Sequence, residues 1–445
     1  MSSDWVETTL GDICRIQGGS IQTGPFGSQL HTSDYTDTGI PVVMPTNIRE
    51  GRISQEDIAR IGTKDVERLS QHQLKIDDIV FSRRGDVTKN SLISKDEDGW
   101  LCGTGCLKVR LGQEQVANAR FISYLLCSPE SKDWLVRHAV GATMPNLNTG
   151  ILAAIPVRLP PLTIQKGIAG TIGVLNDRIT LLRETNKTLE SIARAIFKSW
   201  FVDFDPVRAK MEGRQPEGMD EETAALFPDS FEESELGLVP RGWQIRKFLE
   251  TVDVIGGGTP KTSNPDYWNG GIPWFSVVDA PELSDVWVVR TEKKISEKGL
   301  NESSTKLLPV GTTIISARGT VGKLALTGRE MAMNQSCYGL RGKYDDVFFT
   351  YFSTKRLVDS LRQHSHGSVF DTITKDTLSR VKVVLPAIAC LEKFEQAVDL
   401  VMKQMLAQSE RGYCISQIRD TLLPRLISGQ LRLPEAQEKI EAALL

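Results

Sequence analysis

Two short segments, far apart in the chain, place arginine next to glycine directly after an apolar run. The first is Ser82 to Asp86 (SRRGD), followed by Lys89, and the second is Ser316 to Thr320 (SARGT), followed by Lys323. An arginine at the end of a strand can reach a phosphate, or it can donate two hydrogen bonds to O6 and N7 of guanine. The structural alternative is an arginine that pairs with an acid such as Asp86. Because the pattern recurs in both halves, we favour contact with DNA.

A second pair of segments is rich in side chains that can bind base edges and phosphates. Asn and Thr also stabilise turns, so a structural use stays equally open for these residues. The resulting candidate DNA-binding residues from both pairs of segments are Arg83, Arg84, Lys89, Thr143, Asn146, Asn148, Arg318, Lys323, Ser368, Thr372, Thr374 and Lys375.

Other segments resemble catalytic or metal-binding motifs but are incomplete. Asn264 to Tyr267 (NPDY) approaches the Asn-Pro-Pro-Tyr loop of amino-methyltransferases, without a glycine-rich turn for the methyl donor. Ala317 to Leu324 lacks the first Gly and the final Ser or Thr of a P-loop. Cys102 and Cys106 have no second pair of ligands nearby in the sequence, and two histidines, 364 and 366, are too few for a metal site. We therefore expect a non-catalytic chain without a metal or cofactor of its own.

The arginine segments belong to a larger internal repeat. Trp5 returns as Trp243, at an offset of 238 residues, and the segment Gly141–Leu162 returns as Gly367–Ile388, at an offset of 226. Between them the order is kept while the offset drifts, as insertions and deletions in loops would cause. This period is far too long for a solenoid, so we infer a duplicated domain. Two similar but unequal domains indicate one task carried out at two places.

The first copy reads as an irregular β-rich domain. Its β-branched or apolar runs are broken by Gly, Pro, Asn and Asp, and helical spacing is confined to Ala117–Cys127 and Lys132–His138. The runs that we expect to form strands are Ile13–Ile16, Ile40–Val43, Ile79–Phe81, Leu107–Leu111 and Ile155–Leu159.

A long amphipathic helix is expected after Pro160 and Pro161. Its apolar positions alternate steps of four and three residues, which is typical of a coiled coil. The positions of this seam are Ile168, Ile172, Leu175, Ile179, Leu182, Asn186, Leu189, Ala193, Ile196 and Trp200, of which Asn186 alone is polar. Asn186 either fixes the register or lies where the seam opens. About 40 residues at 1.5 Å each predict a rod of roughly 60 Å that ends before Pro206.

The second copy is followed by a weaker version of this seam. Val398, Val401, Met405, Ile415, Leu422 and Leu426 occupy the apolar positions, while Gln408 and Gly412 interrupt them. The nearest available partner is the first helix, so we expect the two to pair, in antiparallel orientation. The fold class is then α+β, with two β-rich domains in a pseudo-twofold repeat, separated by two long antiparallel coiled-coil helices.

Composition favours a soluble cytoplasmic protein. The 445 residues are 40% hydrophobic, the seven cysteines are an odd number, and neither a signal segment nor an apolar run of membrane-spanning length is evident. The net charge of −3 hides an acidic stretch, Glu212–Arg241, with nine acids and two bases. This stretch reads as a surface linker. The remainder carries a modest positive surplus, which permits binding to DNA.

The chain resembles the specificity subunit of type I restriction–modification enzymes over nearly its whole length. The resemblance rests on the segments that close each repeat (146–162 and 372–388), on Ala195–Val207 (AIFKSWFVDFDPV), and on Leu422–Leu433 (LLPRLISGQLRL). The chain departs from that family at Leu391, where Gln is common, and at Gly412, which weakens the seam.

The resemblance implies a division of the chain into two DNA-reading domains and two helical spacers. Residues 1–160 and 242–386 would be target-recognition domains, 161–205 and 387–433 the central and distal spacers, 206–241 the acidic linker, and 434–445 the tail. Each target-recognition domain would read one half of a split double-stranded DNA site, while the spacer sets the gap between the halves.

The resemblance also implies the partners. The spacer would dock two methyltransferase subunits, and through them restriction and translocase subunits, so S-adenosylmethionine, ATP and Mg²⁺ would bind to partner chains. Four aromatic residues, Phe197, Trp200, Phe201 and Phe204, either form a docking surface for these partners or pack in a core, and packing is slightly favoured. The alternative function is a non-enzymatic cytoplasmic adaptor with duplicated β-rich ligand-binding domains. A methyltransferase that binds its methyl donor without partners is a further rival.

Overall fold

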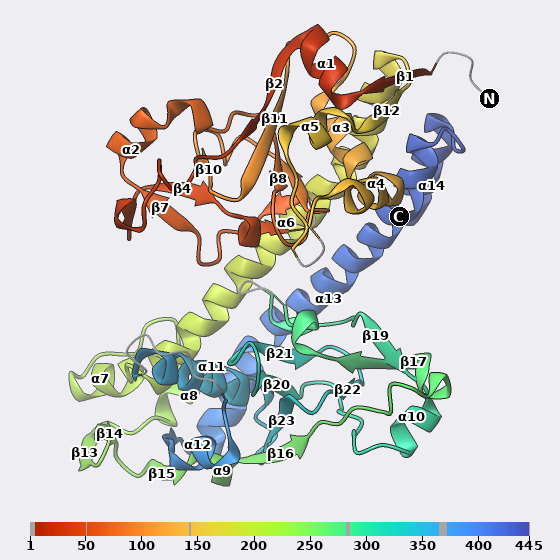
Figure 1. Ribbon diagram of the computed structural model, residues 1–445. Helices are drawn as coiled ribbons and strands as arrows, with labels where there is room; N and C mark the ends of the chain where they lie inside the picture. Colours follow the sequence, from red (N-terminus) through yellow and green to blue (C-terminus); the bar gives the residue numbers. More distant parts are fainter. Residues whose placement is uncertain (1–4, 50, 142–143, 282–284, 365–371, 445) are drawn as a thin grey trace. The chain divides into compact units, whose positions relative to one another are not determined.

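The computed structural model describes residues 5–49, 51–141, 144–281, 285–364 and 372–444. The chain forms two compact units (Figure 1). Unit 1 comprises residues 1–177 and 415–445, and unit 2 comprises residues 178–414. Two long helices, α6 (Leu162–Phe201) and α13 (Ile388–Ile427), contribute to both units. The sequence predicted both.

Unit 1 contains two four-stranded sheets. The first, in the order β2-β11-β8-β9, is antiparallel throughout, and the second has the order β10-β4-β7-β3 with a parallel pair β10–β4. The strands are β1 (Val6–Thr9), β2 (Gly18–Thr23), β3 (Tyr35–Thr36), β4 (Ile40–Val43), β5 (Ile48–Arg49), β6 (Arg52–Ile53), β7 (Ala59–Ile61), β8 (Ile79–Ser82), β9 (Asn90–Leu92), β10 (Leu101–Cys102), β11 (Cys106–Gly112) and β12 (Pro156–Leu159). Four of the five predicted strands are therefore confirmed.

Most helices of unit 1 connect its strands along the chain. They are α1 (Leu10–Gln17), α2 (Thr63–Arg68), α3 (Ala119–Leu126), α4 (Pro129–His138), α5 (Thr149–Ala153) and the C-terminal α14 (Leu433–Leu444), with short 3-10 turns at 32–34, 45–47 and 70–72. α3 and α4 confirm the two predicted helical segments.

The predicted strand Ile13–Ile16 is wrong, because these residues lie in helix α1. Thr9 caps this helix by accepting a 3.1 Å hydrogen bond from the Asp12 N–H, and Gly18 ends it in a left-handed conformation. Leu10, Ile13, Cys14 and Gln17 form its buried face, at the spacing of a helix. The β-branched residues at 13 and 16 suggested a strand, but the cap and this buried face favour a helix.

Unit 2 repeats the strand pairing of unit 1. Its main sheet has the order β16-β23-β20-β21-β18 and a second sheet the order β19-β17-β22, again with a parallel pair. The edge pair β1–β12 of unit 1 has its counterpart in β15–β24. The strands are β13 (Phe231–Ser234), β14 (Gly237–Pro240), β15 (Gln244–Lys247), β16 (Val252–Gly256), β17 (Trp268–Phe275), β18 (Trp287–Val288), β19 (Lys293–Ile295), β20 (Thr313–Ser316), β21 (Leu324–Thr327), β22 (Ala332–Met333), β23 (Cys337–Gly342) and β24 (Lys382–Leu385).

The helices of unit 2 include one long helix that packs beside α6. This is α11 (Val347–His364); the others are α7 (Asp205–Met211), α8 (Glu221–Ala225), α9 (Phe248–Thr251), α10 (Glu297–Asn301) and α12 (Lys375–Arg380), with 3-10 turns at 265–267 and 277–279. No helix of the described residues is both long and apolar enough to cross a membrane.

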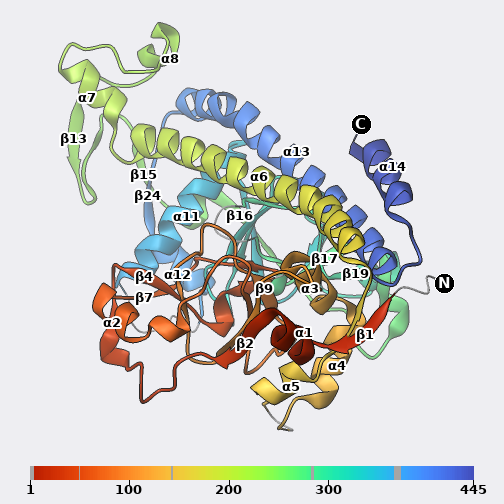
Figure 2. The same ribbon diagram turned by 90° about the horizontal axis from the view of Figure 1, so that it is seen from above.

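Helices α6 and α13 pack together in antiparallel orientation (Figure 2). Within unit 2, the Asn186 Nδ2 atom donates to the Met405 carbonyl oxygen at 3.2 Å, while Phe197 contacts Phe394 with ring centroids 5.9 Å apart. The position in α6 thus rises as the position in α13 falls. Most predicted seam residues are buried, and α13 continues without a break through Gly412. The predicted antiparallel pairing is confirmed.

The aromatic residues near the end of α6 lie in a core. Phe197, Phe201 and Phe204 are buried and Trp200 is half-buried. Phe201 packs on Phe394 with ring centroids 5.1 Å apart. This placement supports packing rather than a docking surface for these four residues.

The acidic segment 212–241 is folded rather than a plain surface linker. It contains α8 and the hairpin β13–β14, and its Met219, Ala224 and Phe227 are buried in the same core as Phe201. Nine of its residues are acidic, but three buried apolar side chains hold it against the core of unit 2.

Candidate functional site

In unit 1 the two predicted DNA-binding segments lie against each other. Strand β8 ends at Ser82, and the following Arg84 forms an antiparallel bridge with Asn146. The Leu147 N–H donates to the Arg83 carbonyl oxygen at 2.9 Å. Gly85 then turns the chain with a φ of +77°, a conformation that side chains other than glycine rarely adopt. The backbone therefore presents Arg84 as an exposed residue at this turn.

Arg83 is held in place by two contacts. Its Nε atom donates to the Asn146 Oδ1 atom at 3.3 Å, and its guanidinium lies over the Phe26 ring, 5.9 Å from the ring centroid. Asp86 does not pair with Arg83 or Arg84; its carboxylate accepts from the Thr88 hydroxyl at 2.6 Å and lies 3.8 Å from the Lys89 Nζ atom. Asp86 therefore pairs with Lys89 and neutralises neither arginine of this turn.

Unit 2 brings the equivalent residues together in the same way. Arg318 forms an antiparallel bridge with Thr372, and the Ile373 N–H donates to the Ala317 carbonyl oxygen at 2.9 Å. Gly319 has a φ of +76°, within a degree of Gly85. Arg318 is exposed. The Lys323 backbone N–H donates to the Ser316 hydroxyl at 2.8 Å and so closes the turn. The two sites share a backbone design and differ in side chains.

Two predicted residues cap helices. The Asn148 Oδ1 atom accepts from the Ile151 N–H at 2.8 Å at the start of α5, and the Thr374 hydroxyl accepts from the Thr377 N–H at 3.0 Å at the start of α12. These bonds satisfy backbone donors that a helix leaves free, so both side chains have a structural task. Lys375 follows as an exposed residue. Thr143 and Ser368 lie outside the described residues.

Sequence reasoning missed two further loops in each site. In unit 1 the Arg83 N–H donates to the Gly105 carbonyl oxygen at 2.8 Å, and a Cβ at Gly24 would lie 2.1 Å from the Gly103 oxygen. The loop that carries Phe26 therefore lies directly beside residues 103–105. Only the recurrence of glycine in these loops could have indicated such a close approach.

The corresponding two loops of unit 2 carry polar side chains. The Ala317 N–H donates to the Ser336 carbonyl oxygen at 2.7 Å, and the Thr259 hydroxyl hydrogen-bonds to Gln335. A Cβ at Gly257 would lie 1.9 Å from the Asn334 oxygen, so this approach also needs glycine. Each site is thus a row of four loops that includes the arginine turn, and we call it the arginine row. In unit 1 it comprises residues 24–26, 103–105, 83–86 and 146–148; in unit 2 it comprises 257–259, 334–336, 317–320 and 372–374.

Two cysteines of unit 1, Cys102 and Cys106, lie in its core. Burial raises the pKa of Cys102 to about 12 and that of Cys106 well above its ordinary value, so both thiols stay protonated. All seven cysteines are free. Among the described residues, no three His, Cys, Asp or Glu side chains gather in a way that could hold a metal ion. The exposed arginines and amides of the rows are suited to binding polar, anionic ligands.

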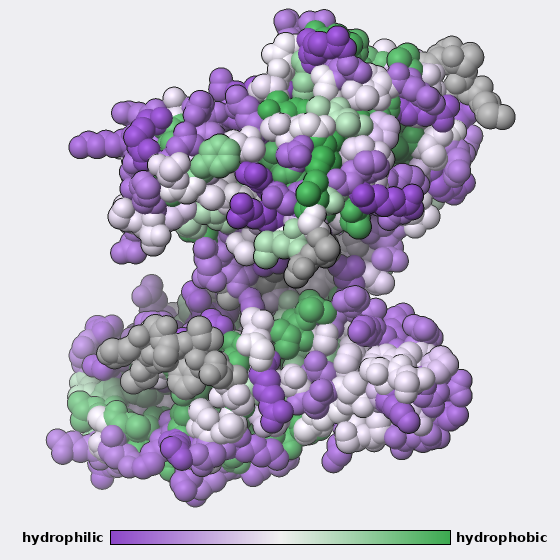
Figure 3. All heavy atoms as spheres, in the orientation of Figure 1, coloured by the Kyte–Doolittle hydropathy of each residue, from purple (hydrophilic) through white to green (hydrophobic). Residues whose placement is uncertain are grey.

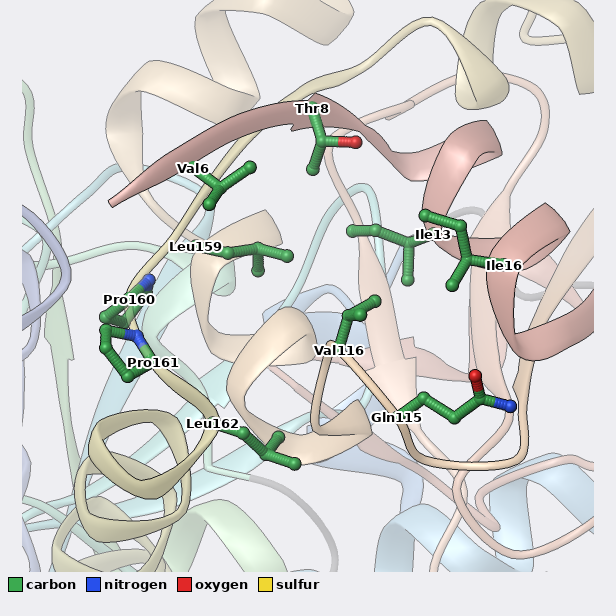
Figure 4. A pocket seen from close by; sticks show the side chains of 10 residues that line it. All are labelled: Val6, Thr8, Ile13, Ile16, Gln115, Val116, Leu159, Pro160, Pro161 and Leu162. Carbon is green, nitrogen blue, oxygen red and sulfur yellow. The ribbon is translucent and has the colours of Figure 1, made fainter. Parts of the chain in front are cut away.

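A hollow in unit 1 lies beside the first turn of α6 (Figure 4). It has a volume of about 270 Å³ and is lined by Val6, Thr8, Ile13, Ile16, Gln115, Val116, Leu159, Pro160, Pro161 and Leu162. Thr8 and Gln115 are its only polar side chains, and none is charged. This lining holds no acid, base or thiol that could perform catalysis.

On the face shown in Figure 3, hydrophilic side chains cover much of each unit, and apolar side chains form smaller patches between them.

The chain is similar to known proteins over most of its length. A family described as the type I restriction modification DNA specificity domain matches residues 2–191 and 240–398. The HindI specificity subunit of Haemophilus influenzae is 25% identical, over 96% of this chain and 100% of that protein. The putative MjaX specificity subunit of Methanocaldococcus jannaschii is 22% identical, over 97% of this chain and 94% of that protein. The crystal structure of an S subunit of a type I restriction-modification system from M. genitalium has 15% identity and a TM-score of 0.48, and it covers 96% of this chain and 97% of that one.

Proposed function

Because the chain belongs to the family of type I restriction–modification DNA specificity proteins, we propose that it is the DNA-recognition subunit of such a complex. Each arginine row contacts one half of a two-part double-stranded site. The chain itself carries out no chemistry in this proposal. Adenine methylation and ATP-driven cleavage belong to partner subunits, which bind S-adenosylmethionine, ATP and Mg²⁺.

The observation that carries the proposal is the pair of equivalent bridges, Arg84–Asn146 and Arg318–Thr372. Two loops that are far apart in the sequence meet at the same place in both units, and each time an exposed arginine emerges from the turn. Arginine can bind guanine through two hydrogen bonds, and Asn can bind adenine in the same manner. The side chains next to the arginine differ, Arg83 in one unit and Ala317 in the other, so the two half-sites are expected to differ in sequence.

For the methyltransferase we propose an exposed stripe on α6 instead of the buried aromatic residues. Leu181, Thr188, Ile192 and Ala195 are exposed and follow one another at steps of seven, four and three residues. This spacing keeps them on one face of the helix, away from the seam that packs on α13. Leu181 and Ile192 are 55% and 45% exposed, which is enough apolar surface for another helix to cover. A methyltransferase subunit that offers an amphipathic helix fits this stripe.

Methylome sequencing of cells with and without this gene tests the proposal. We expect one methylated motif to disappear on deletion, and we expect it to consist of two short parts with an unspecified gap between them. Loss of a continuous motif, or of no motif, would contradict the proposed function. An adaptor with duplicated ligand-binding domains would leave the methylome unchanged and would show no salt-dependent affinity for DNA.

A further inference from the structure

Phe26 is an apolar side chain that the fold holds out into solvent. Phe26 is 54% exposed, although the preceding Pro25 is buried. The Phe26 N–H donates to the Gln29 Oε1 atom at 3.1 Å, and its carbonyl oxygen accepts from the Gln29 and Leu30 N–H groups at 2.8 and 3.1 Å. Both backbone groups of Phe26 are therefore fixed in a turn. A single exposed apolar residue is common, but the backbone of this one is fixed and its ring also contacts the Arg83 guanidinium.

The neighbours of Phe26 are the polar groups of the arginine row. The Arg83 guanidinium lies over its ring, and the Arg83 Nε atom is bound to Asn146 in turn. Gly24 lies against Gly103 in a contact that only glycine permits, so the Phe26 loop cannot shift away from the row without losing that packing. An exposed aromatic face, a guanidinium and an amide thus stand together in one rigid group.

A ligand that satisfies all three groups has an aromatic face, hydrogen-bonding edges and negative charge. A nucleotide has these properties, and stacking of a base on an aromatic side chain contributes about 1–3 kcal/mol. The face of a base becomes available only when the base leaves the duplex stack, as it does for enzymes that modify bases.

We propose that Phe26 stacks on an unstacked nucleobase of the first half-site, while Arg83 contacts the adjoining phosphate. This inference rests on the proposed function. Unit 2 has Thr259 and Gln335 in the corresponding loops of its row, so the effect belongs to one half-site only.

The test uses the chain in complex with its methyltransferase subunits and duplexes that carry the motif found by methylome sequencing. The fluorescent base 2-aminopurine is placed at each position of the first half-site in turn. We expect the wild-type complex to raise the fluorescence at one or more positions, and Phe26→Ala to abolish the rise at one of them. Loss of a stack worth about 1–3 kcal/mol lowers the affinity about 5- to 150-fold.

Ile76→Ala is the matched control, because Ile76 is 49% exposed and precedes strand β8 at the end away from Arg83. Phe26→Leu keeps an apolar side chain without the aromatic face, and we expect it to behave like Phe26→Ala. The inference is overturned if Phe26→Ala matches Ile76→Ala in both affinity and fluorescence, or if Phe26→Leu matches the wild type. If the wild-type complex fails to bind the motif at all, the proposed function fails instead, so the two outcomes are distinguishable.

Discussion

The Lys355 Nζ atom on α11 lies 2.6 Å from the Glu190 Oε1 atom on α6, and this ion pair is shielded from water. The side chains of Glu190 and Lys355 are 6% and 17% exposed. Because α11 follows directly from the main sheet of unit 2, the pair fastens that sheet to the helix. Bringing both charges out of water is costly, so the pair fixes a position more than it adds stability.

Removing one partner of this pair should destabilise unit 2 strongly. We expect Glu190→Leu to lower the free energy of unfolding by about 3–5 kcal/mol, because it leaves the Lys355 charge buried and uncompensated. The double variant Glu190→Leu with Lys355→Met should recover most of this loss. Urea denaturation of the wild type, the single variant and the double variant measures these free energies of unfolding. Equal losses in the single and double variants would show that the charges do not compensate each other.

The arginines of the two rows should act on different half-sites. Arg84→Ala should weaken discrimination in the first half-site and Arg318→Ala in the second, each by about 1–3 kcal/mol if the contact to guanine is bidentate. A contact to phosphate would instead weaken binding to all sequences alike and reduce its salt dependence. The exposed Arg15 on α1, which pairs with Asp12, provides the control Arg15→Ala. Competition binding against half-site variants measures the effects, and unchanged discrimination in both row variants would exclude the arginine turns from base recognition.

The sequence was most informative where one physical constraint dominates. The seam of α6 was predicted residue by residue because burial against a partner helix imposes a strict period, and Ile172 and Leu175 are indeed fully buried. The arginine turns were noticed because the same residue types recur at equivalent positions of the two repeats. Helix α1 was missed because β-branched residues outweighed a short cap, and the Phe26 loop was missed because close approach of Gly24 to Gly103 depends on tertiary contacts.

Glu395 should make unit 2 less stable as the pH rises toward neutrality. Burial raises the pKa of this carboxyl from 4.5 to about 7, although it accepts hydrogen bonds from the Phe349 and Phe348 N–H groups. The folded state therefore holds a proton that the unfolded state releases above pH 4.5. The contribution of Glu395 to stability is fully present below pH 4.5 and is lost as the pH rises to about 7, by at most about 3 kcal/mol.

The variant Glu395→Gln isolates this effect. The free energy of unfolding of this variant should not depend on the titration at position 395. The free energy of unfolding of the wild type should therefore fall relative to that of Glu395→Gln between pH 5 and pH 7. Glu392→Gln, at an exposed position on the same helix, is the control and should follow the wild type. Urea denaturation at a series of pH values provides the measurement. A constant difference between wild type and Glu395→Gln would show that Glu395 does not titrate in this range.

Paired helices α6 and α13 should set the gap between the half-sites. A heptad inserted between Asn186 and Leu189 keeps the phase of the seam and lengthens α6 by roughly 10 Å. Asn186 contacts Met405, whereas Gly412 faces Leu182, which lies before the insertion point. The matching insertion in α13 therefore belongs between Met402 and Met405.

The insertion should change the gap and nothing else. Since ten base pairs rise about 34 Å, we expect the unspecified gap to widen by about one to three base pairs. The bases within each half-site should stay the same, because neither arginine row is altered. Methylome sequencing of cells that carry the double insertion measures both properties. A folded variant that methylates the original gap, or that reads altered bases within a half-site, would show that the spacing is set elsewhere. An insertion in α6 alone is the control; it shifts the seam against α13 and should reduce methylation of every site.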